Sequence, residues 1–75
     1  MPLYWLVYRH NNSIFVVIEP GASIIHARMR SAIAGLDEGD FTEGHELDRK
    51  MKVAKEMVER RLSQEEAKKL LAKLE

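Results

Sequence analysis

The sequence has no cysteine, which excludes several ways of stabilising a small domain. A chain without cysteine forms no disulfide, offers no thiolate nucleophile and holds no cysteine-based zinc site. Its 75 residues suffice for one domain, at a size where a single core is only marginally sufficient. We therefore expect one small domain over residues 1–75, stabilised by packing within the chain or against a second subunit.

An excess of charge of one sign is also missing, because twelve Lys and Arg residues balance twelve Asp and Glu residues. A net charge near zero gives no overall attraction to nucleic acid or to an anionic membrane, so any such attraction has to come from a local patch. The first apolar run ends at Arg9 and no basic residue precedes it, which fits neither a signal peptide nor a membrane-spanning helix. We expect a soluble, cytoplasmic chain without a membrane partner.

Catalytic motifs are absent as well: the sequence contains no GxGxxG, no P-loop, no HExxH and no glycine-flanked serine. The acidic stretch 37–48 holds six carboxylates, but its glycines do not fall where an EF-hand loop needs them. We therefore expect a protein that is not an enzyme and that binds no cofactor or metal. If the stretch did hold a cation weakly, its conceivable ligands are Asp37, Asp40, Glu43 and His45.

Two apolar runs, Leu3–Arg9 and Ser13–Glu19, flank a pair of asparagines and predict a β-hairpin. The runs are rich in β-branched and aromatic residues, and adjacent asparagines tolerate the positive φ angles of a primed two-residue turn. Neither face of the hairpin is polar, because successive strand residues point to opposite faces and both sets are apolar. In the first strand these sets are Leu3, Trp5 and Val7 against Tyr4, Leu6 and Tyr8. A hairpin of this kind has to be covered on both sides.

A first helix is predicted from about Ile24 to Ala34, with Ser23 as its N-cap and Gly35 as its C-terminal stop. Its apolar residues recur at intervals of three and four, and Arg28 and Arg30 lie on the flanks of this stripe. The stripe consists of Ile25, Met29, Ala32, Ile33 and Leu36.

The second half of the chain is predicted to be mainly helical after the acidic loop. Asp48 is a candidate cap for a helix to about Arg60, and the capping box that begins at Ser63 predicts a helix from Gln64 to about Lys73. The fold class is therefore α+β in the order ββααα, an antiparallel hairpin with helices on both of its faces. The alternative is ββαβα, with a short third strand near 41–47.

No string of residues matches a family motif, so the function is inferred from the excess of apolar surface. The leading hypothesis is a non-catalytic protein–protein interaction or regulatory module, either a homodimer or part of a larger assembly. If the apolar faces are incompletely buried within one chain, the interface anchors are Trp5, Phe15, Leu70 and Leu71.

The alternative hypothesis is a nucleic-acid-binding domain that uses the basic segment 49–61. This segment carries six basic and two acidic residues, and basic side chains on one helix are able to contact phosphates. The basic residues are Arg49, Lys50, Lys52, Lys55, Arg60 and Arg61. A simpler interpretation is that this segment neutralises residues 37–48 or faces solvent.

Overall fold

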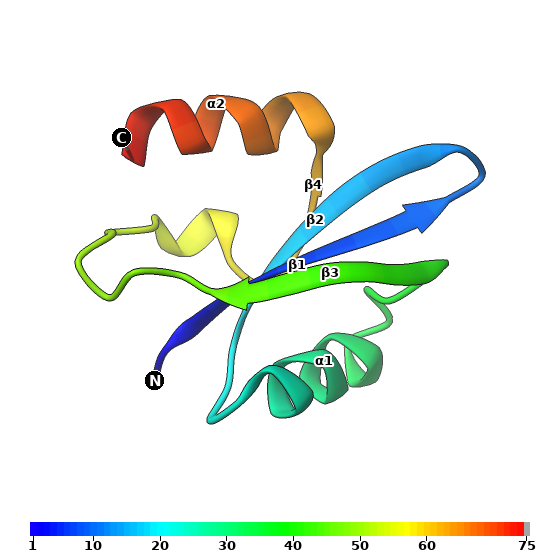
Figure 1. Cartoon of the computed structure of the whole chain (residues 1–75), viewed down its shortest axis with the longest axis horizontal. Helices are drawn as coiled ribbons and strands as arrows, with labels where there is room; N and C mark the ends of the chain where they lie inside the picture. The colour runs from blue at the N-terminus through cyan, green and yellow to red at the C-terminus, as the bar shows by residue number, and fades with distance from the viewer. Residues whose placement is uncertain (75) are drawn as a thin grey trace.

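A four-stranded antiparallel sheet with two helices forms the protein, as seen in a computed structural model that describes residues 1–74 and the side chains of residues 1–73 (Figure 1). The sheet order is β3-β1-β2-β4. The elements are β1 (Leu3–His10), β2 (Ser13–Pro20), α1 (Ile24–Ile33), β3 (Asp40–Glu46), a 3₁₀ turn (Lys55–Met57), β4 (Arg61–Ser63) and α2 (Gln64–Leu74). The α+β class is confirmed. The order ββααα is wrong, because the chain runs ββαββα.

The hairpin of β1 and β2 is confirmed, with a register that runs from Leu3 opposite Pro20 to His10 opposite Ser13. Asn11 and Asn12 form the turn with φ angles of 48° and 64°. Two consecutive positive φ angles are the signature of a type I′ turn, whose twist matches that of the flanking strands. The strand ends at Pro20, which has no N–H to donate to the ladder.

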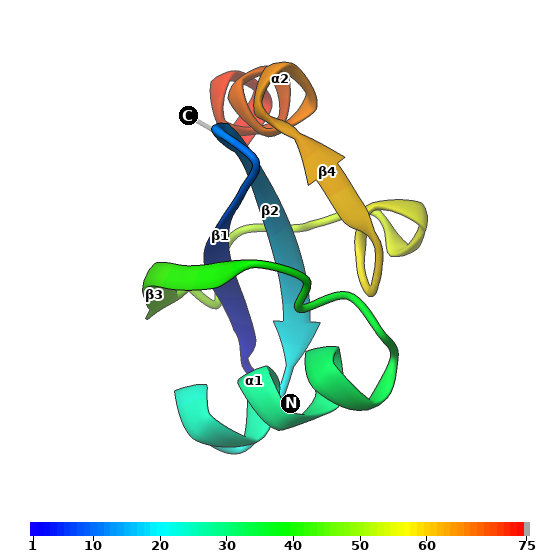
Figure 2. The same ribbon diagram turned by 90° about the vertical axis from the view of Figure 1, so that its right-hand side faces the viewer.

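Both faces of the hairpin are apolar and both are covered by the chain itself (Figures 1 and 2). On one side α1 covers a cluster formed by Tyr4, Leu6, Tyr8, Val17 and Ala27. On the other side lie α2 and the segment between β3 and β4, which cover Trp5, Val7, Val16, Ile18, Leu47, Leu62, Ala67 and Leu70. The sheet is therefore the middle layer of three. Within residues 1–74 no helix is long and apolar enough to cross a membrane.

The third strand corrects the prediction of a loop over 37–48 and agrees with the alternative that placed a strand near 41–47. β3 pairs with the edge of β1 that the hairpin leaves free, and this pairing gives the exposed backbone groups of β1 their partners. The register shifts between Phe41 and Glu43, which makes Thr42 the extra residue of a bulge and places Phe41 opposite Tyr8. The two rings meet edge to face, with centroids 5.7 Å apart.

The helix predicted between Asp48 and Arg60 is absent, and the chain there is irregular apart from the 3₁₀ turn. Asp48 does start a turn, because its Oδ1 accepts a hydrogen bond from the Lys50 backbone at 2.9 Å, but no helix follows. Four apolar residues of the segment pack against the cluster on the α2 side without a helix, namely Met51, Val53, Met57 and Val58, whereas Ala54 is exposed. Glu59 then adopts a positive φ of 60°, which turns the chain into β4 beside β2.

The helix predicted from the capping box at Ser63 is confirmed as α2. Ser63 Oγ accepts a hydrogen bond from the Glu66 backbone N–H at 3.1 Å, and Glu66 Oε1 accepts one from the Ser63 N–H at 3.3 Å. The bond from the Ser63 backbone lowers the pKa of Glu66. Of the apolar stripe predicted for this helix, the side chain of Leu74 lies outside the described residues.

The missed strand β4 makes a testable prediction about Leu62. Its side chain is fully buried, so Leu62→Ala should lower the free energy of unfolding by about 2–5 kcal/mol. Leu71→Ala is the matched control. Leu71 is 36% exposed, so this substitution should lower the free energy of unfolding clearly less. Urea unfolding of both variants measures the two losses. Equal losses would contradict the burial of Leu62 in the layer between β4 and α2.

Candidate functional site

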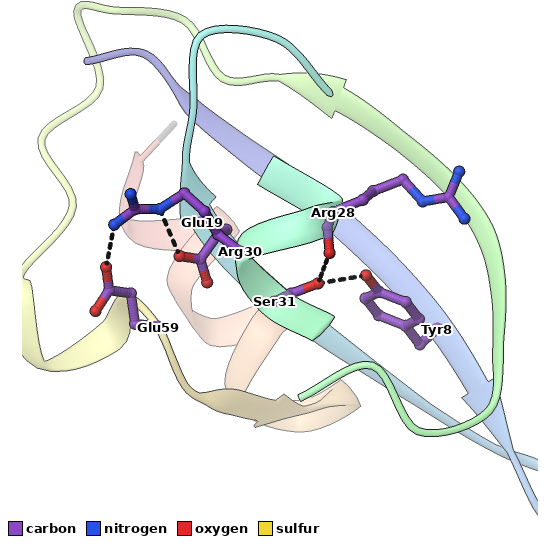
Figure 3. Close-up of polar contacts among 6 residues, drawn as sticks. All are labelled: Tyr8, Glu19, Arg28, Arg30, Ser31 and Glu59. Carbon is purple, nitrogen blue, oxygen red and sulfur yellow. Dashed lines mark hydrogen bonds and ion pairs between the residues drawn. The ribbon is translucent and has the colours of Figure 1, made fainter. Parts of the chain in front are cut away.

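Small residues form the inner face of α1, which lets the helix lie close to the sheet. Ala27 and Ser31 lie one helical turn apart and are fully buried. A Cβ added at Gly21 would come within 2.7 Å of the Ala27 backbone nitrogen, which shows how closely the helix approaches the end of β2. Ser31 Oγ donates a hydrogen bond to the Arg28 carbonyl oxygen (Figure 3). It also lies 2.8 Å from Tyr8 Oη. Because the Ser31 proton is already donated, the Tyr8 hydroxyl is the donor in this second bond.

The outer face of α1 carries the large apolar residues, which we call the outer stripe: Ile25, Met29 and Ile33. They lie one turn apart and keep 65%, 56% and 86% of their surface exposed. The stripe from which this helix was predicted therefore faces solvent, apart from half-buried Leu36. The sequence does contain the true inner face, because Ile24, Ala27 and Ser31 also recur at intervals of three and four.

The outer stripe is flanked by basic groups and by no carboxylate of α1. The Arg28 guanidinium lies 4.0 Å from the centroid of the Phe41 ring, on the side of β3. On the other side Arg30 lies 3.3 Å from a carboxylate oxygen of Glu59. His26 is exposed beside the stripe. The surface of α1 is therefore apolar along its centre, with Arg28 on one margin and the ion pair of Arg30 with half-exposed Glu59 on the other.

Arg30 also fixes the helix to β2 through a buried carboxylate (Figure 3). Glu19 is only 2% exposed, and its Oε1 lies 3.4 Å from Arg30 Nε. Its Oε2 is buried and has no hydrogen-bond partner among the described residues. Burial raises the pKa of Glu19, the hydrogen bond from Arg30 opposes this effect, and the negative charge of Glu59 adds to it.

A hollow of about 290 Å³ lies beside the outer stripe, next to the loop that joins β2 to α1. Its apolar lining comes from Met1, Ala22, Met29 and Ile33. His26 and Arg30 supply its polar rim. The hollow and the outer stripe are thus parts of one surface, since they share two residues.

The four predicted interface anchors do not lie together on the surface. Trp5 and Leu70 are 6% and 8% exposed and belong to the core on the α2 side. Phe15 is half-buried, with its ring stacked on Tyr8 at a centroid distance of 5.3 Å. Only Leu71 is substantially exposed. These residues were predicted as anchors only if they were incompletely buried within one chain. Trp5 and Leu70 are buried, so they do not meet this condition.

The six basic residues of segment 49–61 do not share a helix face, because the segment is not a helix. Arg49, Arg60 and Arg61 pair with the carboxylates of Glu46, Glu66 and Glu38 at distances of 3.4, 2.6 and 3.2 Å. The exposed lysines Lys50, Lys52 and Lys55 form no ion pair within the described part of the chain. Three of the six residues proposed to contact phosphates are thus paired with carboxylates. This agrees with the simpler interpretation that the basic segment neutralises acidic side chains. Nucleic-acid binding stays a prediction with less support than before.

The acidic residues proposed as cation ligands lie along β3 and the loop before it. Among residues 1–74 no group of three or more His, Asp or Glu side chains is arranged to hold a metal ion. Glu43 and His45 share one face of β3, opposite Val7 and Trp5 of β1. The structure therefore does not gather Asp37, Asp40, Glu43 and His45 into one site.

The chain matches no protein-family model, and no curated protein or solved structure matches it at a significant level. Its function therefore has to be inferred from its own geometry. The feature that folding alone does not explain is the exposed outer stripe.

Because α1 buries its small residues and exposes its large apolar ones, substitutions on its two faces should affect stability differently from those on an ordinary amphipathic helix. Polar substitutions on the outer stripe, Ile25→Ser, Met29→Gln and Ile33→Ser combined, should change the free energy of unfolding by less than about 1 kcal/mol. Ala27→Leu adds apolar bulk to the inner face and should cost about 1–3 kcal/mol through overpacking. Urea unfolding measures both. A large loss in the triple variant with a gain in Ala27→Leu would mean that the helix packs by its other face.

The raised pKa of Glu19 predicts a pH-dependent stability. Its folded-state pKa lies above the ordinary value of 4.5, so its contribution to stability is complete below 4.5 and is lost as the pH rises through the folded-state pKa. Unfolding free energies at a series of pH values should therefore show the wild type losing stability with rising pH relative to Glu19→Gln. Glu59→Gln should move this loss to lower pH, because it removes a repulsive charge. A difference between wild type and Glu19→Gln that stays constant with pH would contradict the assignment.

Proposed function

We propose that this chain is a non-catalytic protein interaction module that binds its partner through the outer stripe of α1. The observation that carries the proposal is the exposure of Ile25, Met29 and Ile33 on one helical face. Single exposed apolar residues are ordinary on protein surfaces, whereas contiguous apolar patches mark interaction sites. The sequence led to the same class of function. The exposure of the outer stripe supports α1 as the candidate surface in place of the sheet and α2.

The stability of the fold does not account for the outer stripe. Helix α1 contacts the sheet through Ala27, Ser31 and Ile24, and its N-terminus is capped by Ser23 Oγ, which accepts a hydrogen bond from the His26 N–H at 3.3 Å. None of these contacts involves the outer stripe. Polar residues in its place would leave them intact, so the apolar residues need an explanation outside the folding of this chain.

The outer stripe also has the rigidity that a binding surface needs. The Tyr8–Ser31 hydrogen bond and the Glu19–Arg30 contact fix α1 to β1 and β2 from below. A helix held in this way loses little conformational freedom when a partner binds, and such preorganisation favours affinity. Helix faces with anchors at i and i+4 are a common recognition mode.

Site-specific photo-crosslinking in the native cell tests this proposal. A benzophenone crosslinker at Met29 should give a discrete adduct of higher mass, because this position lies at the centre of the contact. The same group at Lys69, an exposed position on α2, is the control and should not give this adduct. Ile25→Ser and Ile33→Ser introduced together should abolish the adduct at Met29 without unfolding the chain. Identical adducts from both positions, or none from Met29, would overturn the proposal.

A further inference from the structure

We propose that the outer stripe binds a second copy of this chain, in an antiparallel pair of α1 helices related by a twofold axis. In this pair Met29 of each copy lies at the axis, and Ile25 of each copy contacts Ile33 of the other. The inference rests on the function proposed above and names the partner. It follows from the spacing of the stripe, from the hollow beside it and from the charges at the two ends of α1.

The spacing of the outer stripe makes it complementary to itself. Ile25 and Ile33 are each four residues from Met29, so each lies about 6 Å from it along the helix axis. A twofold axis through Met29 therefore places Ile25 of one copy opposite Ile33 of the other. Residues four apart form the ridges of the commonest class of helix packing, in which the two helices cross at about −50°. A ridge of this kind packs beside an identical ridge, as the contact in a symmetric dimer requires.

The hollow gives the most exposed residue of the stripe a place to pack. Ile33 keeps 86% of its surface exposed and touches little of its own chain. In the antiparallel pair it lies beside the N-terminal half of the other α1, where Ala22, His26 and Met29 line the hollow. The volume of about 290 Å³ leaves space there for an apolar side chain. Twofold symmetry repeats this contact, so both Ile33 side chains lose exposure to water.

The two ends of α1 carry opposite charge. The first turn of the helix contains no acidic residue, and the free N–H groups of a helix N-terminus carry partial positive charge. Beyond the C-terminus lies Asp37, which is exposed and forms no ion pair within residues 1–74. Antiparallel pairing places Asp37 of each copy near the first turn of α1 in the other. This attraction also occurs twice in the dimer and favours the antiparallel direction over the parallel one.

The flanks of the stripe do not oppose the pairing, because among the described residues neither flank carries only one sign of charge. Arg28 lies over Phe41, at the edge of the acidic segment 37–48. Arg30 lies 3.3 Å from a carboxylate oxygen of Glu59 on the other flank. The twofold axis brings each flank next to its own copy, where mixed charges avoid the repulsion that a purely basic flank would cause.

The small size of the surface predicts a weak dimer. The contact centres on three large exposed side chains of a ten-residue helix. It therefore belongs with the transient interfaces that bury less than about 1,200 Å² in total. We expect a dissociation constant between about 10 μM and 1 mM, the range of weak complexes.

Disulfide trapping tests the contact, because the chain has no cysteine of its own. Met29→Cys places a thiol at the twofold axis. With oxidised glutathione it should form a disulfide dimer about tenfold faster than Lys69→Cys, because association raises the local concentration of the two thiols. Lys69 is the control, since it is exposed on α2, across the sheet from the stripe. Equal rates for the two variants would overturn the inference.

A mixture of two single-cysteine variants tests the direction of the helices. Ile25→Cys and Ile33→Cys should form a mixed disulfide faster than either variant pairs with itself. In the antiparallel pair, equivalent positions lie about 12 Å apart along the helix, beyond the reach of a disulfide, whose Cα atoms are less than about 7 Å apart. Faster pairing of each variant with itself would overturn the antiparallel arrangement.

Sedimentation measures whether the unmodified chain associates. The weight-average mass of the wild type should rise toward that of a dimer between about 10 μM and 1 mM, the range expected for an interface of this size. The variant with Ile25→Ser, Met29→Gln and Ile33→Ser should stay a monomer. A wild type that stays a monomer throughout, or a dimer that persists in the triple variant, would overturn the inference.

A charge variant tests the contact between the helix ends. Asp37→Asn should weaken the dimer about two- to fivefold, since it removes two exposed attractions to a helix N-terminus. Glu56→Gln removes the same charge from the exposed surface on the α2 side and should leave the affinity unchanged. Equal effects of the two variants would overturn the role of Asp37.

The crosslinker at Met29 in the native cell separates a failure of this inference from a failure of the proposed function. Its adduct should have twice the mass of the chain and contain peptides of this chain only. An adduct with a different protein, combined with a monomer in sedimentation, would overturn the second copy and leave the proposed function standing. The absence of any adduct would overturn the proposed function itself.

Discussion

The apolar side chains on both faces of the β1–β2 hairpin are the constraint on which the rest of the structure depends. A two-stranded ribbon cannot shield either of its own faces, so the remaining residues have to supply a layer on each side. The chain divides this task between α1 on one face and α2 with the irregular segment after β3 on the other. The strands β3 and β4 complete the two edges, which widens both faces.

The two layers that cover the sheet differ in where the apolar bulk comes from. On the α2 side the covering segments bring apolar bulk to the sheet through Leu47, Leu70 and the four half-buried residues between β3 and β4. On the α1 side the sheet supplies most of the bulk through Tyr8, Phe15 and Phe41, and the helix adds the small residues Ala27 and Ser31 together with half-buried Ile24. This division leaves Ile25, Met29 and Ile33 without a place in the core.

Local signals in the sequence predicted the hairpin and both helices, because turn asparagines, a capping serine and a capping box act within a few residues. The strands β3 and β4 depend on edges formed by distant residues, so hydrophobic periodicity alone did not separate β4 from a helix. The outer stripe was missed for a related reason. Periodicity indicates that Ile25, Met29 and Ile33 share a face, but which face turns inward depends on contacts with the rest of the fold, among them the close approach of Gly21 to Ala27 and the hydrogen bond between Tyr8 and Ser31.

The rotation of α1 about its axis is specified by polar contacts. If the helix turned to bury the outer stripe, it would gain apolar contacts but would remove Ser31 from Tyr8 and Arg30 from Glu19. A buried hydroxyl and a buried carboxylate would then lose their partners, and unpaired buried polar groups cost more than the bonds themselves contribute. Glu19 thus opposes the alternative packing, even though its own burial is unfavourable when it is charged. The same contacts that hold the helix keep its apolar face toward solvent, where a partner is able to reach it.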